Sequence, residues 1–217
     1  MTPFTNLSRR TIALALGVAA AAAPTAHAGP LARADLVDVR TYAPSIGTDV
    51  RYATRDNFTR AVLPGYCKPL ALTRRPAARA LGRVERRLAR AGLGLLVYDA
   101  YRPVRATRAM VRWAERSGNE WVLDQGYVAR RSNHNQGAAI DLTLVRSADG
   151  RPLGMGTRFD AFTPRSHTAN ATGAALRNRL TLKRAMEAFG FRNYRREWWH
   201  YDFPAASGPP RDIPLGC

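Results

Sequence analysis

The chain has 217 residues, enough for one domain with a hydrophobic core. Its 34 lysines and arginines exceed its 16 acidic residues, and the formal net charge is +18. Nearly all of the positive charge is arginine spread along the chain, and no basic motif with interleaved aromatic residues occurs, so we expect no nucleic-acid partner. A basic surface also suits anionic lipid or an anionic cell-wall polymer, but the even spread favours a solvated surface with no dedicated partner.

The first 28 residues have the composition of an export signal. Arg9 and Arg10 precede an apolar run from Ile12 to Ala23, and the small residues AHA stand before Gly29 as a cleavage site. This run of about 12 residues is too short to span a bilayer stably. A retained membrane anchor is the alternative. The paired arginines also resemble a twin-arginine signal, which would carry the protein across the membrane already folded.

Cleavage there leaves a mature domain at residues 29–217 and lowers the net charge from +18 to +16, because two arginines leave and no acidic residue does. We predict a periplasmic, extracellular or wall-associated protein with no stable membrane insertion. In such an oxidising compartment Cys67 and Cys217 would form a disulfide that ties down the C-terminus, with two unpaired thiols as the alternative. Neither belongs to a C-x-x-C pair, which argues against a cysteine zinc site.

The first half of the mature chain predicts irregular structure followed by helix, strand and helix. Residues 29–66 contain many turn residues and short extended pieces such as VRYAT. From Pro76 to Ala91 apolar residues recur at helical spacing before Gly92, which predicts an amphipathic helix packed on a sheet. LGLLVYDA, residues 93–100, predicts a buried strand, and residues 103–118 predict a second helix opened by proline and closed by glycine.

The second half predicts strand, helix and strand. From Ala139 onward, Ile140, Leu142 and Leu144 alternate with smaller or polar residues, as in a half-buried strand. A third helix is expected from about 174 to 189, and FRNYRREWWHYDF, from 191, is aromatic and strand-like. Helices and strands mix without regular β-α-β alternation. We therefore predict a single α+β domain with a central antiparallel sheet and flanking helices.

An aspartate interrupts the strand that begins at residue 139. An unpaired carboxylate on a half-buried strand costs roughly several kcal/mol, so Asp141 needs a cation. His134 lies seven residues earlier across a turn at Gly137, and His200 follows Glu197 by three residues. Two histidines and one aspartate can hold a zinc ion with one position left open for water. The alternative is a salt bridge from Asp141 to one of the many arginines.

Glu197 is the natural partner of such a water molecule. Zinc-bound water loses a proton near neutral pH, and a carboxylate beside it can act as general base and later as proton donor. We therefore keep Glu197 outside the ligand set. The sequence contains no H-E-x-x-H, which excludes the common helix-borne zinc protease pattern.

The pattern S-x-H-x-x-G-x-A-x-D at residues 132–141, followed by E-x-W-H at 197–200, resembles the zinc D-alanyl-D-alanine dipeptidases of the vancomycin-resistance type. The wider match includes VRYATRDNF, YDAYRP, GYVARRSNHNQGAAIDLTL, MGTRFD and EWWHY, and it spans most of the mature chain. The resemblance implies the fold shared by D-alanyl-D-alanine peptidases and the hedgehog signalling domain. It also implies one zinc ion per chain and a small D,D-dipeptide as substrate.

The resemblance assigns roles to individual residues. The zinc ligands of the family fall on His134, Asp141 and His200, and its catalytic base falls on Glu197. His167 matches a family position without a known metal role, so we leave it out of the ligand set. The arginine of its D-x-x-R-P segment falls on Arg102, where a guanidinium would stabilise the oxyanion of the tetrahedral intermediate.

Other positions bear on substrate binding. Asp160 falls where the family places a carboxylate for the free amine of the substrate, and Ser132 where a hydroxyl can meet the substrate carboxylate. Asp99 would orient the oxyanion arginine, with a strand-end cap as the alternative. Trp198 and Trp199 would wall the zinc site, with aromatic core packing as the alternative.

The expected reaction is hydrolysis of D-alanyl-D-alanine to two D-alanines, in cell-wall peptide metabolism. A D,D-carboxypeptidase or endopeptidase acting on longer stem peptides is the first alternative. A non-catalytic wall-binding module is the second, but it would lack the base or a ligand, and all four residues are present. The export signal differs from the cytoplasmic resistance enzymes, so we expect a role in recovering wall-derived dipeptide outside the cytoplasm.

Overall fold

The computed structural model describes Met1 and residues 35–217. The expected signal at residues 1–28 and its cleavage site therefore lie outside the described residues, apart from Met1. In the part of the chain that is described, no helix combines the length and the apolar composition that crossing a membrane requires.

The centre of the domain is a five-stranded sheet in the order β2-β4-β5-β7-β6. The strand bounds are β2 (Gly47–Thr48), β4 (Leu93–Asp99), β5 (Ala139–Arg146), β6 (Arg192–Asn193) and β7 (His200–Asp202). The pairs β4-β5, β5-β7 and β7-β6 are antiparallel, whereas the edge strand β2 runs parallel to β4. A separate antiparallel pair joins β1 (Leu36–Asp38) to β3 (Leu72–Arg74).

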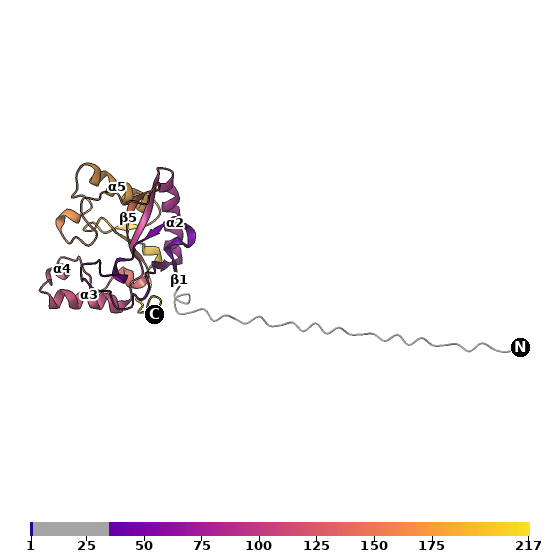
Figure 1. The fold of residues 1–217 in the computed structure, drawn as a ribbon, viewed down its shortest axis with the longest axis horizontal. Helices are drawn as coiled ribbons and strands as arrows, with labels where there is room; N and C mark the ends of the chain where they lie inside the picture. Colours follow the sequence, from indigo (N-terminus) through magenta and orange to yellow (C-terminus); the bar gives the residue numbers. More distant parts are fainter. Residues whose placement is uncertain (2–34) are drawn as a thin grey trace.

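Helices flank this sheet, which confirms the predicted α+β class. The helices are α2 (Arg75–Ala89), α3 (Val104–Arg116), α4 (Trp121–Asp124) and α5 (Gly173–Glu187). The two long helices α2 and α5 contact each other and pack on β4 and β5 respectively. Figure 1 shows α3 and α4 together at one end of the domain, α5 at the other, and β5 between them.

The sheet has a core face and a site face, as the alternation of β5 predicts. Leu142 pairs with Val97 and Leu144 with Leu95, and all four side chains are fully buried in the core. Thr143 pairs with Leu96 on the opposite face, which Asp141 shares. The three predicted helices are also confirmed, with ends that differ by one or two residues.

Two local predictions are wrong. VRYAT is not extended: Arg51–Ala53 form the 3-10 helix η2, because Thr54 N–H donates to Arg51 O and the amide of Asn57 donates to both Arg51 O and Thr54 O. The segment from 191 to 203 is not one strand either. It is a hairpin of β6 and β7, and the side-chain amide of Asn193 stabilises its turn by donating to Glu197 O and His200 O.

The C-terminus is tied to the domain by a disulfide, as predicted. Cys67 is bonded to Cys217, with 5.1 Å between the Cα atoms. Backbone hydrogen bonds support the same contact, because Leu215 N–H donates to Gly65 O at 2.7 Å and Lys68 N–H donates to Leu215 O at 3.0 Å. The last residues therefore pack beside the loop that precedes β3.

Candidate active site

Three acidic or histidine side chains form one row across the sheet. Asp99 on β4 pairs with Asp141 on β5, and Asp141 pairs with His200 on β7. Residues directly opposite each other on antiparallel strands project from the same face. Asp99 reaches this face because the register of β4 shifts between Val97 and Asp99, where Tyr98 is the extra residue of a β-bulge.

His134 approaches the row from a short capped turn. It lies in the 3-10 helix η3 (Asn133–Gln136), whose N-cap Ser132 accepts the N–H of His134 at 3.3 Å. The turn ends at Gly137, which has a φ of 69°, and a Cβ there would lie 2.7 Å from Leu36 Cδ2. Only glycine suits both constraints, and this explains the glycine between His134 and the strand.

The hydrogen bonds of the two histidines define which nitrogens carry protons. Nδ1 of His134 lies 2.6 Å from the carbonyl oxygen of Ala100, and Nε2 of His200 lies 3.1 Å from Asp202 Oδ1. Because both oxygens are acceptors, the outer nitrogen of each neutral ring donates its hydrogen. The inner nitrogens, Nε2 of His134 and Nδ1 of His200, then hold lone pairs.

These lone pairs converge with a carboxylate oxygen. Nε2 of His134 lies 3.2 Å from Nδ1 of His200, and Oδ1 of Asp141 lies 3.3 and 3.0 Å from the same two atoms. A proton can bridge one pair of these atoms, whereas a metal ion satisfies all three. For ligands about 2.0–2.1 Å from zinc, the edge of a tetrahedron is about 3.3–3.4 Å. The donor triangle therefore fits one face of a tetrahedral metal site.

Glu197 lies beside the triangle without belonging to it. It occupies the turn between β6 and β7, and its Oε2 is 4.0 Å from Nδ1 of His200. Burial raises the pKa of Glu197 to about 8, and the nearby Asp141 carboxylate adds to the shift while His200 opposes it. A bound cation would oppose the shift further, so metal and Glu197 ionisation favour each other.

Arg102 borders the triangle from the other side. Asp99, which is 0% exposed, accepts its Nε at 2.9 Å and lies 2.8 Å from its Nη2. Nη2 is also 3.7 Å from Asp141 Oδ2, and the guanidinium lies over the ring of Tyr52, 4.9 Å from the centroid. Burial opposes the charge on Arg102, but Asp99, Tyr52, Tyr66 and Asp141 together outweigh it and hold the pKa well above its usual value.

Asp160 presents a carboxylate without an ion pair. The hydroxyl of Tyr52 lies 3.1 and 3.3 Å from its two oxygens, and no lysine, arginine or histidine of residues 35–217 pairs with it. Burial raises the pKa of Asp160 well above its usual value, and Asp141 and Glu197 add to the shift. Its φ of 59° is left-handed, a conformation that few residues other than glycine adopt. A cationic group at this position would relieve the desolvated carboxylate.

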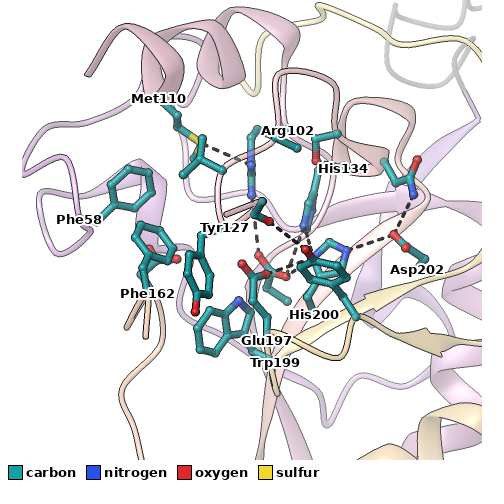
Figure 2. Close-up of a pocket in the computed structure, with 18 of the residues that line it drawn as sticks. Phe58, Arg102, Met110, Tyr127, His134, Phe162, Glu197, Trp199, His200 and Asp202 are labelled. Carbon is teal, nitrogen blue, oxygen red and sulfur yellow. Dashed lines mark hydrogen bonds and ion pairs between the residues drawn. The ribbon is translucent and has the colours of Figure 1, made fainter. Parts of the chain in front are cut away.

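All of these groups except Asp99 line one cavity of about 310 Å³. This volume is at the lower end of the range of about 300–1,000 Å³ for small-molecule sites. Figure 2 shows the rings of Phe58 and Phe162 on the side of the cavity opposite His200 and Asp202. The cavity thus joins an apolar wall to a polar end that carries the donor triangle.

The described part of the chain matches a known family over nearly its whole length. A family model for peptidase M15, described as D-ala-D-ala dipeptidase, matches residues 32–214. The chain belongs to this family. The D-alanyl-D-alanine dipeptidase of Streptomyces coelicolor is 36% identical over 198 residues, which cover 83% of this chain and 98% of that relative.

Two more relatives are each 38% identical to this chain. The D-alanyl-D-alanine dipeptidase of Escherichia coli is 38% identical over 178 residues, covering 81% of this chain and 88% of the relative. The enzyme of the same name from Enterococcus faecalis is 38% identical over 168 residues, covering 70% and 83%. A solved LdcB LD-carboxypeptidase aligns with a TM-score of 0.41 and 20% identity over 62% of each chain.

The remaining predicted residues of this M15 chain differ in whether they line the cavity. Ser132 and Trp199 line the cavity. Asp99 is buried behind Arg102 and is not among the residues that line the cavity, so its position suits orientation of the arginine and not a contact with substrate. Trp198 does not line the cavity either, because its Nε1 donates to Thr157 Oγ1 at 2.8 Å in the neighbouring loop.

Sequence reasoning missed two polar contacts in this M15 site. The first is between Asp202 and His200. The sequence could have indicated it, because residues two apart on a strand share a face and metal-bound histidines usually donate to a carboxylate. The second involves Tyr52, which contacts both Asp160 and Arg102. Nothing in the sequence around Tyr52 indicates these contacts. His167 lies outside the triangle, where its Nε2 is 3.1 Å from the hydroxyl of Tyr127.

Proposed function

We propose that this protein hydrolyses D-alanyl-D-alanine to two D-alanines with a zinc ion held by His134, Asp141 and His200. One observation carries the proposal: a small cavity combines three converging lone-pair donors with the carboxylate of Asp160, which has no cationic partner among residues 35–217. A metal and a substrate ammonium group supply the two missing cations. Membership of the M15 dipeptidase family and relatives of that name support the same reaction.

The catalytic roles follow from the positions of the side chains. When bound, zinc supplies Lewis-acid polarisation of the scissile carbonyl and makes a water molecule more acidic. Glu197, buried beside the triangle, takes the proton of the attacking water and returns it to the leaving amine. Arg102 faces the oxygen on which negative charge develops, and Asp99 keeps its guanidinium in place from behind.

The termini of the dipeptide account for the polar groups that remain. The ammonium group would pair with Asp160, whose desolvated carboxylate gains most from a cation. The substrate carboxylate would meet the hydroxyl of Ser132, which accepts the His134 N–H and keeps its own hydrogen for donation. A site that pairs both termini discriminates against peptides that extend beyond them.

The cellular role we propose is recovery of wall-derived dipeptide outside the cytoplasm. The basic, apolar and small-residue regions at positions 1–28 support export, since they have the order of a cleaved signal. The Cys67–Cys217 disulfide is consistent with an oxidising compartment. We propose residues 29–217 as the mature enzyme.

The test is a comparison of three substrates with the purified mature protein loaded with zinc. We expect efficient hydrolysis of free D-alanyl-D-alanine, at least about 10-fold weaker hydrolysis of the N-acetylated dipeptide, and less still of a pentapeptide stem. Metal-stripped protein serves as the control and should be inactive until zinc is restored. Comparable specificity constants for pentapeptide and dipeptide would overturn the proposal in favour of a carboxypeptidase.

A further inference from the structure

A buried arginine on α5 holds the loop that carries Asp160. Arg179 is 1% exposed, and its Nε donates to the carbonyl of Met155 at 2.7 Å. Its Nη1 donates to the carbonyls of Arg165 and His167, at 3.0 and 2.7 Å. Met155 and His167 are the two ends of the segment 155–167, which we call the Asp160 loop. One guanidinium therefore joins both ends of this loop to the same helix.

The charge of Arg179 makes this arrangement costly. No carboxylate of residues 35–217 pairs with it, and burial lowers its pKa. Its Nη2 has no hydrogen-bond partner in the same part of the chain. A buried cation that is balanced only by carbonyl dipoles is less favourable than an apolar side chain of similar size. The position of the loop, and not the stability of the core, is what the arginine supports.

The loop needs such support because its central residue is strained. Asp160 has a φ of 59°, and a left-handed residue other than glycine persists only where its surroundings hold it. Contacts within the loop help, since Thr157 Oγ1 is 3.0 Å from Ser166 Oγ. Trp198 also holds the loop from outside, because its Nε1 donates to Thr157 Oγ1 and its backbone N–H to Ser166 O. Arg179 adds a link from both ends of the loop to α5, which these bonds do not provide.

We infer that Arg179 is a positioning residue that determines specificity for the free amine, because it fixes the Asp160 loop and thereby the carboxylate that meets the substrate ammonium. This inference rests on the proposed function. It separates the recognition of the amine from the chemical step, since Arg179 contacts none of the residues of the donor triangle. Loosening the loop should weaken binding of the free dipeptide without disturbing the metal.

The experiment compares Arg179→Lys with Arg177→Lys, an exposed arginine on the same helix. For Arg179→Lys we expect KM for D-alanyl-D-alanine to rise about 10-fold or more, with kcat within about threefold of wild type. The preference for the free over the N-acetylated dipeptide should fall in parallel. Zinc content should equal that of wild type. Arg177→Lys should match wild type in every measurement.

A double-mutant cycle with Asp160→Asn tests whether Arg179 acts through the carboxylate. In the Asp160→Asn background, Arg179→Lys should have no further effect on KM or on the preference. Should Arg179→Lys fail to fold, Gly156→Ala disturbs the packing of the same loop end on α5, because the added Cβ would lie 3.1 Å from Ala175 Cβ and 3.2 Å from Arg179 Nη2.

The outcomes separate the inference from the proposed function. If Asp160→Asn abolishes the preference while Arg179→Lys and Gly156→Ala retain it, the inference is overturned and the dipeptidase function stands. If Arg179→Lys lowers kcat and zinc content instead of raising KM, the positioning role is also overturned. If Asp160→Asn leaves the preference intact, both the amine-binding role of Asp160 and the inference are overturned. Wild-type protein that does not hydrolyse the dipeptide would refute the function itself.

Discussion

Asp141 and His200 lie directly opposite each other on β5 and β7, with 3.0 Å between Oδ1 and Nδ1. Strand pairing alone therefore brings together two of the three donors of the candidate metal site. A shift of one residue in this pairing would move one of the two side chains to the core face. The third donor, His134, depends instead on the capped turn η3 and on the Ala100 carbonyl.

Substitution of either histidine should remove the metal. We expect His134→Ala and His200→Ala to retain well under half of the wild-type zinc after dialysis, because two remaining ligands hold zinc poorly. Metal analysis by atomic emission gives the stoichiometry. His167→Ala is the matched control, since this histidine contacts Tyr127 outside the donor triangle, and it should keep the full zinc content. Wild-type zinc content in His134→Ala or His200→Ala would disprove the ligand assignment.

Replacement of the proposed base should separate metal binding from turnover. Glu197→Gln keeps the shape of the side chain but cannot accept a proton, so we expect stoichiometric zinc and kcat reduced by about 100-fold or more. Steady-state kinetics and metal analysis on the same preparation measure both effects. Full activity in this variant would exclude Glu197 from the mechanism.

Arg102 should not tolerate its conservative replacement. Its planar guanidinium contacts Asp99 through Nε and Nη2 while bordering the donor triangle, and the single ammonium of lysine cannot do both. We expect Arg102→Lys to lower kcat/KM by about 100-fold or more, with zinc content unchanged. Arg105→Lys, at an exposed arginine that pairs with Asp212, should retain wild-type kinetics. Near-normal turnover in Arg102→Lys would show that a simple positive charge suffices.

The buried carboxyl of Glu85 should make stability depend on pH. Glu85 is 4% exposed, and it accepts Ser45 Oγ–H at 2.7 Å and Leu95 N–H at 2.9 Å. Burial raises its pKa above the usual 4.5. A carboxyl whose pKa is higher in the folded state contributes stability that is complete below its unfolded pKa and is lost as the pH rises through the folded pKa.

Glu85→Gln removes this titration while it keeps an acceptor for Leu95 N–H. We therefore expect the free energy of unfolding of the variant, relative to wild type, to rise as the pH increases above the usual carboxyl pKa of 4.5. Urea unfolding at several pH values measures the difference. A difference that stays constant or falls over this range would contradict the prediction.

The disulfide should contribute substantially to stability. Cys67 and Cys217 are 150 residues apart, so the bond closes a long loop in the unfolded chain. Loss of a native disulfide typically costs about 2–5 kcal/mol, and we expect a decrease in that range for the Cys67→Ser, Cys217→Ser double variant. Mass spectrometry of wild type should show that the reductant adds the mass of two hydrogen atoms. Free thiols in undamaged protein would refute the bond.

Periodicity identified the long elements and the faces of β5, since the apolar residues repeat over more than one turn or pleat. Helix ends were less well predicted, because caps depend on hydrogen bonds and not on hydrophobicity. Pro103, expected to open α3, is its N-cap. VRYAT was expected to be extended, but the side-chain amide of Asn57, three to six residues from its acceptors, stabilises a 3-10 turn there.

The candidate ligands could be found from residue type and spacing, because few side chains explain a carboxylate inside an apolar strand. Contacts between segments that are distant in the sequence could not be found in this way. Tyr52 and Asp160 are 108 residues apart, and neither position alone indicates that the hydroxyl faces the carboxylate. The sequence also could not show that Trp198 lies outside the cavity. Its indole donates to Thr157, in a loop whose path depends on the tertiary structure.

The extra residue Tyr98 in β4 has a consequence for protein engineering. In an uninterrupted ladder Tyr98 would stand opposite Asp141, and Asp99 would point with Leu95 and Val97 into the core. Grafting the two histidines and Asp141 onto an idealised sheet would thus reproduce the ligands but leave Arg102 without its anchor. A transplanted site that keeps this sequence must include the irregular strand, because the extra residue is what turns Asp99 to the site face.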